Sequence, residues 1–131
     1  MIVVRALAML GAIQAAPAAP PATQASGITR TVLQQHDLGI PGWEVIQTRV
    51  DFTPGATAPR HVHAGDEVVY VLKGKIEYRV DGQPRATLNA GDVLFIPKAK
   101  PHSAENVGLE PASELATYVV EKGKPLVVPL P

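Results

Sequence analysis

The sequence contains no cysteine, so disulfide bonds, thiol nucleophiles and thiolate metal sites are all excluded. Aromatic residues make up only 5% of the chain, and lysine and arginine are nowhere clustered. The formal net charge is zero, which argues against nucleic-acid or anionic-membrane partners. Hydrophobic residues nevertheless make up 46% of the 131 residues, enough for the core of one domain.

No apolar run is long enough to cross a bilayer. The longest near the N-terminus, Ala6–Ile13, follows Arg5 and precedes an Ala/Pro-rich stretch with small residues at Ala16-Pro17-Ala18 and Thr23-Gln24-Ala25. This pattern predicts a signal peptide and leader over residues 1–25 and a periplasmic or secreted protein. The alternative is an N-terminal helix with a Pro-rich linker on a cytoplasmic protein.

Residues 26–131 are expected to form a single domain of short strands separated by turns. The segments 29–38 and 43–52 are extended and rich in β-branched residues, and Asp81-Gly82 separates two further strand-like runs as in a hairpin. Strands at this spacing predict an all-β protein, an antiparallel sandwich or barrel without long helices.

Two histidines, His61 and His63, lie in one of these strand-like segments. Alternate residues of a strand point to the same face, about 6.6 Å apart, so both imidazoles can reach one metal ion. Glu67 opens the next apolar strand, where an unpaired carboxylate would be costly to bury, and His102 follows another apolar run. Three histidines and one glutamate at strand edges indicate a ligand set.

These residues resemble the two sequence motifs of the cupin superfamily, in particular its small, single-domain, quercetinase-like bacterial members. The resemblance covers residues 43–121 and implies a jelly-roll β-barrel that binds one divalent metal. The first motif is matched by Gly55-x5-His61-x-His63-x3-Glu67-x6-Gly74, and the second by Gly91-x5-Pro97-x3-Pro101-His102-x3-Asn106.

The chain departs from the second motif at Ala99, where the family usually has glycine. If this turn needs a left-handed backbone, alanine there costs roughly 1–2 kcal/mol.

The resemblance implies that His61, His63, Glu67 and His102 are the ligands of one divalent transition metal ion, among Mn, Fe, Ni, Cu and Zn. Three functions remain open: a small-molecule dioxygenase, a redox-neutral isomerase, decarboxylase or lyase in which Glu67 or a bound water moves a proton, and a non-catalytic binding module.

A small-molecule substrate or ligand is the expected partner. Phe95 is expected to line its pocket or to pack in the core. Gln47 is expected either to contact it or to lie on a solvated outer face. The strands around residues 68–72 and 93–96 are apolar on both faces, which predicts a homodimer or sheet-on-sheet packing within one chain.

Overall fold

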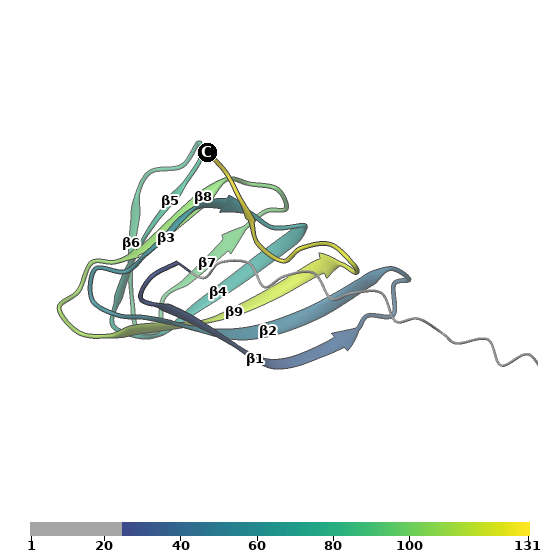
Figure 1. Ribbon diagram of the computed structural model, residues 1–131, viewed down its shortest axis with the longest axis horizontal. Helices are drawn as coiled ribbons and strands as arrows, with labels where there is room; N and C mark the ends of the chain where they lie inside the picture. Colours follow the sequence, from purple (N-terminus) through teal and green to yellow (C-terminus); the bar gives the residue numbers. More distant parts are fainter. Residues whose placement is uncertain (1–24) are drawn as a thin grey trace, which may run out of the picture.

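A computed structural model describes residues 25–131, which form two five-stranded antiparallel sheets (Figure 1). No helix occurs in this range, so none of its segments is a helix that could span a membrane. The predicted signal peptide lies outside the described residues. The strands are β1 (Ile28–Asp37), β2 (Trp43–Phe52), β3 (Thr57–Val62), β4 (Gly65–Lys73), β5 (Lys75–Val80), β6 (Ala86–Asn89), β7 (Val93–Ile96), β8 (His102–Asn106), β9 (Ala112–Glu121) and β10 (Val128–Pro129).

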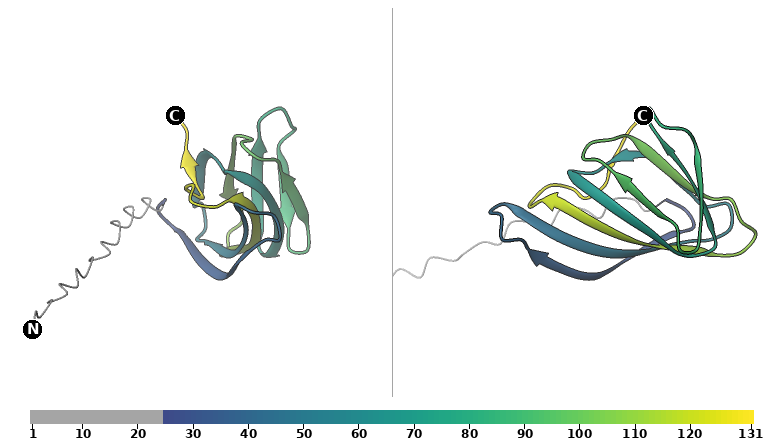
Figure 2. Two further views of the ribbon diagram at one scale, coloured as in Figure 1. Left: turned by 90° about the vertical axis from the view of Figure 1, so that its right-hand side faces the viewer. Right: turned by 180° about the vertical axis from the view of Figure 1, so that it is seen from behind.

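The first sheet has the strand order β1-β2-β9-β4-β7, and the second has the order β10-β3-β8-β5-β6. Views from the side and from behind show the two sheets curving around a shared interior (Figure 2). Every sheet neighbour is antiparallel, and most neighbours are distant in sequence, as expected for a jelly roll. The predicted all-β barrel is therefore confirmed.

The hairpin expected at Asp81-Gly82 is present, and a second hairpin joins the first two strands. β1 and β2 pair across the turn at residues 38–42, and β5 pairs with β6 beyond Asp81-Gly82. Gly82 has a φ of 79°, a left-handed conformation that glycine adopts without a steric penalty.

The interior is built by strict alternation of buried and outward-facing residues, seen most clearly along β9. Its core residues from the two sheets include Val50, Phe52, Val69, Ile76 and Tyr78, each almost fully buried. Seven polar or charged residues are buried along with them: Thr48, His61, His63, Glu67, His102, Asn106 and Glu114. Such a polar interior calls for an explanation, because buried polar groups are costly unless they have partners.

Candidate metal centre

The three histidines of the predicted ligand set meet inside the barrel. His61 lies near the end of β3 and pairs across the strands with His102 at the start of β8, while His63 follows β3 directly. The ring centroids of His61 and His63 are 4.8 Å apart, and those of His61 and His102 are 4.2 Å apart. The prediction that His61 and His63 face the same way is confirmed.

Each of these rings is oriented by a main-chain carbonyl. Nδ1 of His61 lies 2.7 Å from the carbonyl oxygen of Pro59, that of His63 lies 2.6 Å from Leu126, and that of His102 lies 2.9 Å from Lys100. A carbonyl oxygen only accepts, so each Nδ1 must carry the proton and donate it. Each Nε2 is then left with a free lone pair, the form of imidazole that ligates a metal.

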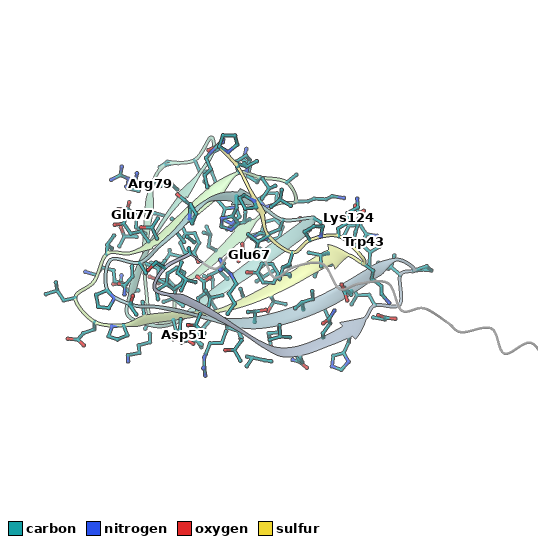
Figure 3. All side chains as sticks on the ribbon, in the orientation of Figure 1. Trp43, Asp51, Glu67, Glu77, Arg79 and Lys124 are labelled. Carbon is teal, nitrogen blue, oxygen red and sulfur yellow. The ribbon has the colours of Figure 1, made fainter. Side chains whose placement is uncertain are left out.

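Glu67 brings a carboxylate to the same point from the facing sheet. It lies in β4, opposite Tyr118 on one side and Ile96 on the other, and Figure 3 shows it between the two layers. Its Oε2 is 3.2 Å from Nε2 of His63 and 3.3 Å from Nε2 of His102. Ligand atoms about 2.0–2.2 Å from one metal lie roughly 3.0–3.4 Å apart, so these separations fit a shared ion.

Two of the four candidate ligand atoms are unsatisfied. Nε2 of His63 and Oε2 of Glu67 are buried and have no hydrogen-bond partner. The ligand atoms of the three histidines lie within 4.8 Å of one another. Two nitrogen lone pairs facing a carboxylate oxygen repel it unless a cation lies between them, so the residues present fit a metal ion.

The electrostatics of the cluster favour a divalent cation. Burial, together with the neighbouring His102, lowers the pKa of His61 from 6.5 to about 4, so this ring is neutral at physiological pH. Burial alone would raise the pKa of Glu67, but hydrogen bonds donated by the rings of His102 and His63 outweigh that effect and lower it to about 2. Where both Nε2 atoms are unprotonated, a bound cation would stabilise the carboxylate in their place. Glu67 is therefore ionised and supplies the anionic charge of the set.

Two close backbone approaches hold the ligands in place. At Gly65, between His63 and Glu67, a Cβ would overlap the carbonyl oxygen of Val119, so only glycine lets β4 run this close to β9. Ala99 is the single non-glycine residue with positive φ in the described range, at 57°. The N–H of Ala99 donates a hydrogen bond to the carbonyl oxygen of His63 (3.1 Å). The strained loop expected from the sequence therefore ties the segment before His102 to His63.

The two residues expected to touch a substrate lie elsewhere. Phe95 is 54% exposed on the outer face of β7, so the expectation that it lines the pocket or packs in the core is wrong. The buried position of that strand is the next one, Ile96. Gln47 also faces outward, where it accepts a hydrogen bond from Gln34 and donates one to Thr117.

The interior contains functional groups that were not predicted. Glu114 is buried on β9 and accepts a hydrogen bond from the hydroxyl of Tyr78, and burial raises its pKa well above the usual value. The Tyr118 ring lies 4.8 Å from that of His63, and Arg30 points inward from β1. The period-two alternation of "ASELATYVV" places Glu114 and Tyr118 on one face, and this pattern could have indicated that both are buried. No sequence pattern indicates that Arg30 points inward.

Comparison with known proteins identifies the family of the chain. Residues 48–125 match the Cupin domain family. The chain is 31% identical over 110 residues to the Arabidopsis thaliana germin-like protein subfamily 2 member 2, covering 78% of this chain and 48% of the relative. It is 30% identical over 108 residues to the Triticum aestivum oxalate oxidase GF-3.8, again covering 48% of that protein.

A solved structure of oxalate oxidase in complex with the substrate analogue glycolate superposes with a TM-score of 0.65 at 25% identity. The match covers 83% of this chain and 63% of that one. The chain thus spans about half the length of the curated relatives it matches.

Proposed function

The chain belongs to the cupin family, and from this premise we propose that its three clustered histidines and Glu67 bind one divalent transition metal ion. The observation that carries the proposal is the set of three Nδ1–H groups donated to main-chain carbonyls. This arrangement leaves every Nε2 free to ligate, beside the carboxylate oxygen of Glu67.

We propose further that the metal-bound protein is a small-molecule dioxygenase, which oxidises an oxygen-bearing substrate with dioxygen. The three histidines and Glu67 would hold the metal ion, and the ion would supply Lewis acidity to a substrate oxygen. The similarity to oxalate oxidases over 72% of this chain supports an oxidative reaction.

The residues of the chain have separate roles in this proposal. The main-chain carbonyls orient the imidazoles, and the buried walls exclude water from the centre. Glu67 holds the negative charge. Burial and the nearby carboxylates raise the pKa of Tyr118, so its hydroxyl keeps its proton and remains a hydrogen-bond donor beside Glu67.

The test is elemental analysis of the native protein, followed by oxygen-uptake measurements with a flavonol, a diketone and oxalate. Metal at about one ion per chain and metal-dependent oxygen uptake are expected. Turnover under nitrogen would contradict the dioxygenase and support a redox-neutral enzyme instead. A tightly held zinc ion without exchangeable water would indicate a structural site.

We also propose a homodimer joined through the outer face of β4 and β7. β7 is an edge strand, and Val68 pairs with Phe95, and Tyr70 with Val93, in a patch that no part of the described chain covers. A second copy would bury the patch and shield the open edge. Light scattering should give twice the monomer mass, and Phe95→Asp should give the monomer; a wild-type monomer at micromolar concentration would refute the dimer.

Residues 1–25 remain a proposed export signal that precedes a single domain over residues 26–131. N-terminal sequencing of protein from the producing cell should find a chain that begins between Ala16 and Ser26. Intact Met1 on soluble protein would contradict export.

A further inference from the structure

Four buried side-chain atoms in the described part of the chain lack a hydrogen-bond partner, and only two of them belong to the proposed metal ligands. The other two are Nε of Arg30 and Oγ1 of Thr48. Arg30 as a whole is half-buried, and its Nε is the guanidinium atom that is buried without a partner. An unpaired buried polar atom costs free energy, and more so when it belongs to a charged group. A pair of such groups on neighbouring strands therefore calls for a ligand.

Arg30 and Thr48 lie on the inner face of the sheet that carries Glu67. Thr48 pairs with Ala116, two residues from Tyr118, which in turn pairs with Glu67. A two-residue step along a strand is about 6.6–6.8 Å, so Thr48 lies one such step from the level of the metal ligands.

Arg30 lies one further two-residue step from the level of the metal ligands. It pairs with Val50, two residues beyond Thr48, and its long side chain can reach back along the sheet. Ala116, the residue beside Thr48, is fully buried but small, so no long side chain from β9 separates Thr48 from the interior.

The positive charge of Arg30 influences buried groups, but Arg30 forms no ion pair with any of the described residues. It lowers the pKa values of Glu114 and Tyr118, although burial raises both overall. Glu114 already accepts its hydrogen bond from Tyr78, and Arg30 takes part in none of the ion pairs that the described residues form. A structural counter-ion for Glu114 would be expected to form one.

We infer that Arg30, with the hydroxyl of Thr48 on the neighbouring strand, binds a carboxylate of the substrate. The planar guanidinium matches a carboxylate in two parallel hydrogen bonds, and Thr48 supplies a further donor. The substrate class is then a small organic acid that has one oxygen-bearing end at the histidines and Glu67 and a separate carboxylate toward β1. This inference rests on the proposed function, because the metal binds the other end.

The test uses ligands that differ only in the distal carboxylate. The protein loaded with Mn²⁺ is titrated calorimetrically with malate and with 2-hydroxybutyrate, and then with 2-hydroxyglutarate and 2-hydroxypentanoate. Each pair shares the 2-hydroxy-acid end and the chain length. We expect at least one diacid to bind tenfold or more tightly than its monoacid.

The variants assign that preference to the residues. Arg30→Gln should abolish the diacid preference, Arg30→Lys should retain part of it, and Thr48→Val should reduce it severalfold. Arg49→Gln is the matched control, because Arg49 faces outward from the neighbouring strand in an ion pair with Asp51 and should bind as wild type. If Arg30→Gln does not fold, Thr48→Val still has to show the loss.

The failures are distinguishable. A wild-type protein that takes up no metal overturns the proposed function and this inference together. A metal-loaded wild type that binds diacids and monoacids equally, or an Arg30→Gln protein that keeps the preference, overturns the inference alone.

Discussion

The barrel buries two glutamates on the inner face of one sheet, and their surroundings shift their pKa values in opposite directions. Glu67 meets two imidazoles, which lower its pKa to about 2, so it is a carboxylate. For Glu114, burial and the charge of Glu67 raise the pKa well above normal, and Tyr78 is its hydrogen-bond partner, so it keeps its proton to a higher pH than an ordinary glutamate. Burial by itself favours the neutral form of both glutamates, so the difference between their pKa values comes from the neighbouring groups.

The two ends of the interior also differ in how they are supported. Tyr78 and Glu114 lie within strands of facing sheets, fixed by regular pairing on both sides. The metal-ligand end depends on a loop with a strained residue, Ala99, and on carbonyls outside the central strands. Strain concentrates at the end with the proposed chemistry, as expected where geometry serves function rather than stability.

The largest expected effect is on metal affinity, which should depend on Glu67 and the three histidines but not on Glu114. Alanine at His61, His63 or His102, or Glu67→Gln, should lower metal affinity by well over tenfold, because each change removes a ligand. Glu114→Gln should keep the metal. Calorimetric titration and elemental analysis measure this, with His36→Ala on exposed β1 as the control. Unchanged metal content in all three histidine variants would contradict the site.

A second change weakens the metal-ligand end without replacing a ligand. Deleting residues 125–131 removes the carbonyl of Leu126 that fixes the His63 ring, together with β10, which pairs with β3 at Val62 and His61. Loss of such a partner typically lowers metal affinity 10–100-fold. Leu126→Val keeps the carbonyl and should bind as wild type, so equal affinity of the truncated and full chains would show that the carbonyl has no role.

The two ends should respond to pH in opposite directions. In the metal-free protein the pKa values of His61 and Glu67 are lowered, so the unfolded chain binds protons first, and the free energy of unfolding should fall as pH drops from 6.5 towards 2. The raised pKa of Glu114 has the reverse effect, a loss of stability as pH rises above 4.5.

Glu114→Gln isolates that second effect. It should leave stability near pH 4 almost unchanged and raise it at pH 8, because the amide needs no proton to stay neutral and still accepts from Tyr78. Denaturant unfolding of the metal-free protein at both pH values measures this. A variant less stable than wild type at pH 8 would mean that Glu114 is ionised.

The smallest expected effect concerns the strained loop. Ala99→Gly should raise the free energy of unfolding by up to about 1 kcal/mol, the relief of a left-handed alanine less the added flexibility of glycine. Metal affinity should not change, since the ligands stay in place. The equivalent change at an unstrained position, Ala104→Gly in β8, should destabilise the protein instead.

Local patterns were enough to predict part of this structure. Turn chemistry located the hairpin at Asp81-Gly82, and period-two alternation placed His61 and His63 on one face. The run "VLFI" is apolar throughout and carries no information on its phase, so Phe95 was assigned to the wrong side. Arg30 reaches its position only through the pairing of β1 with β2, a non-local fact that no spacing in the sequence reveals.

The atoms that select the imidazole tautomers belong to the polypeptide backbone at Pro59, Lys100 and Leu126. Nearly any amino acid at these three positions supplies the same oxygen. Substitutions there can accumulate without penalty to the proton arrangement, provided that the chain keeps its path. Homologous sequences can therefore drift at these positions while the ligands stay invariant, and an alignment would give no sign of what holds the rings.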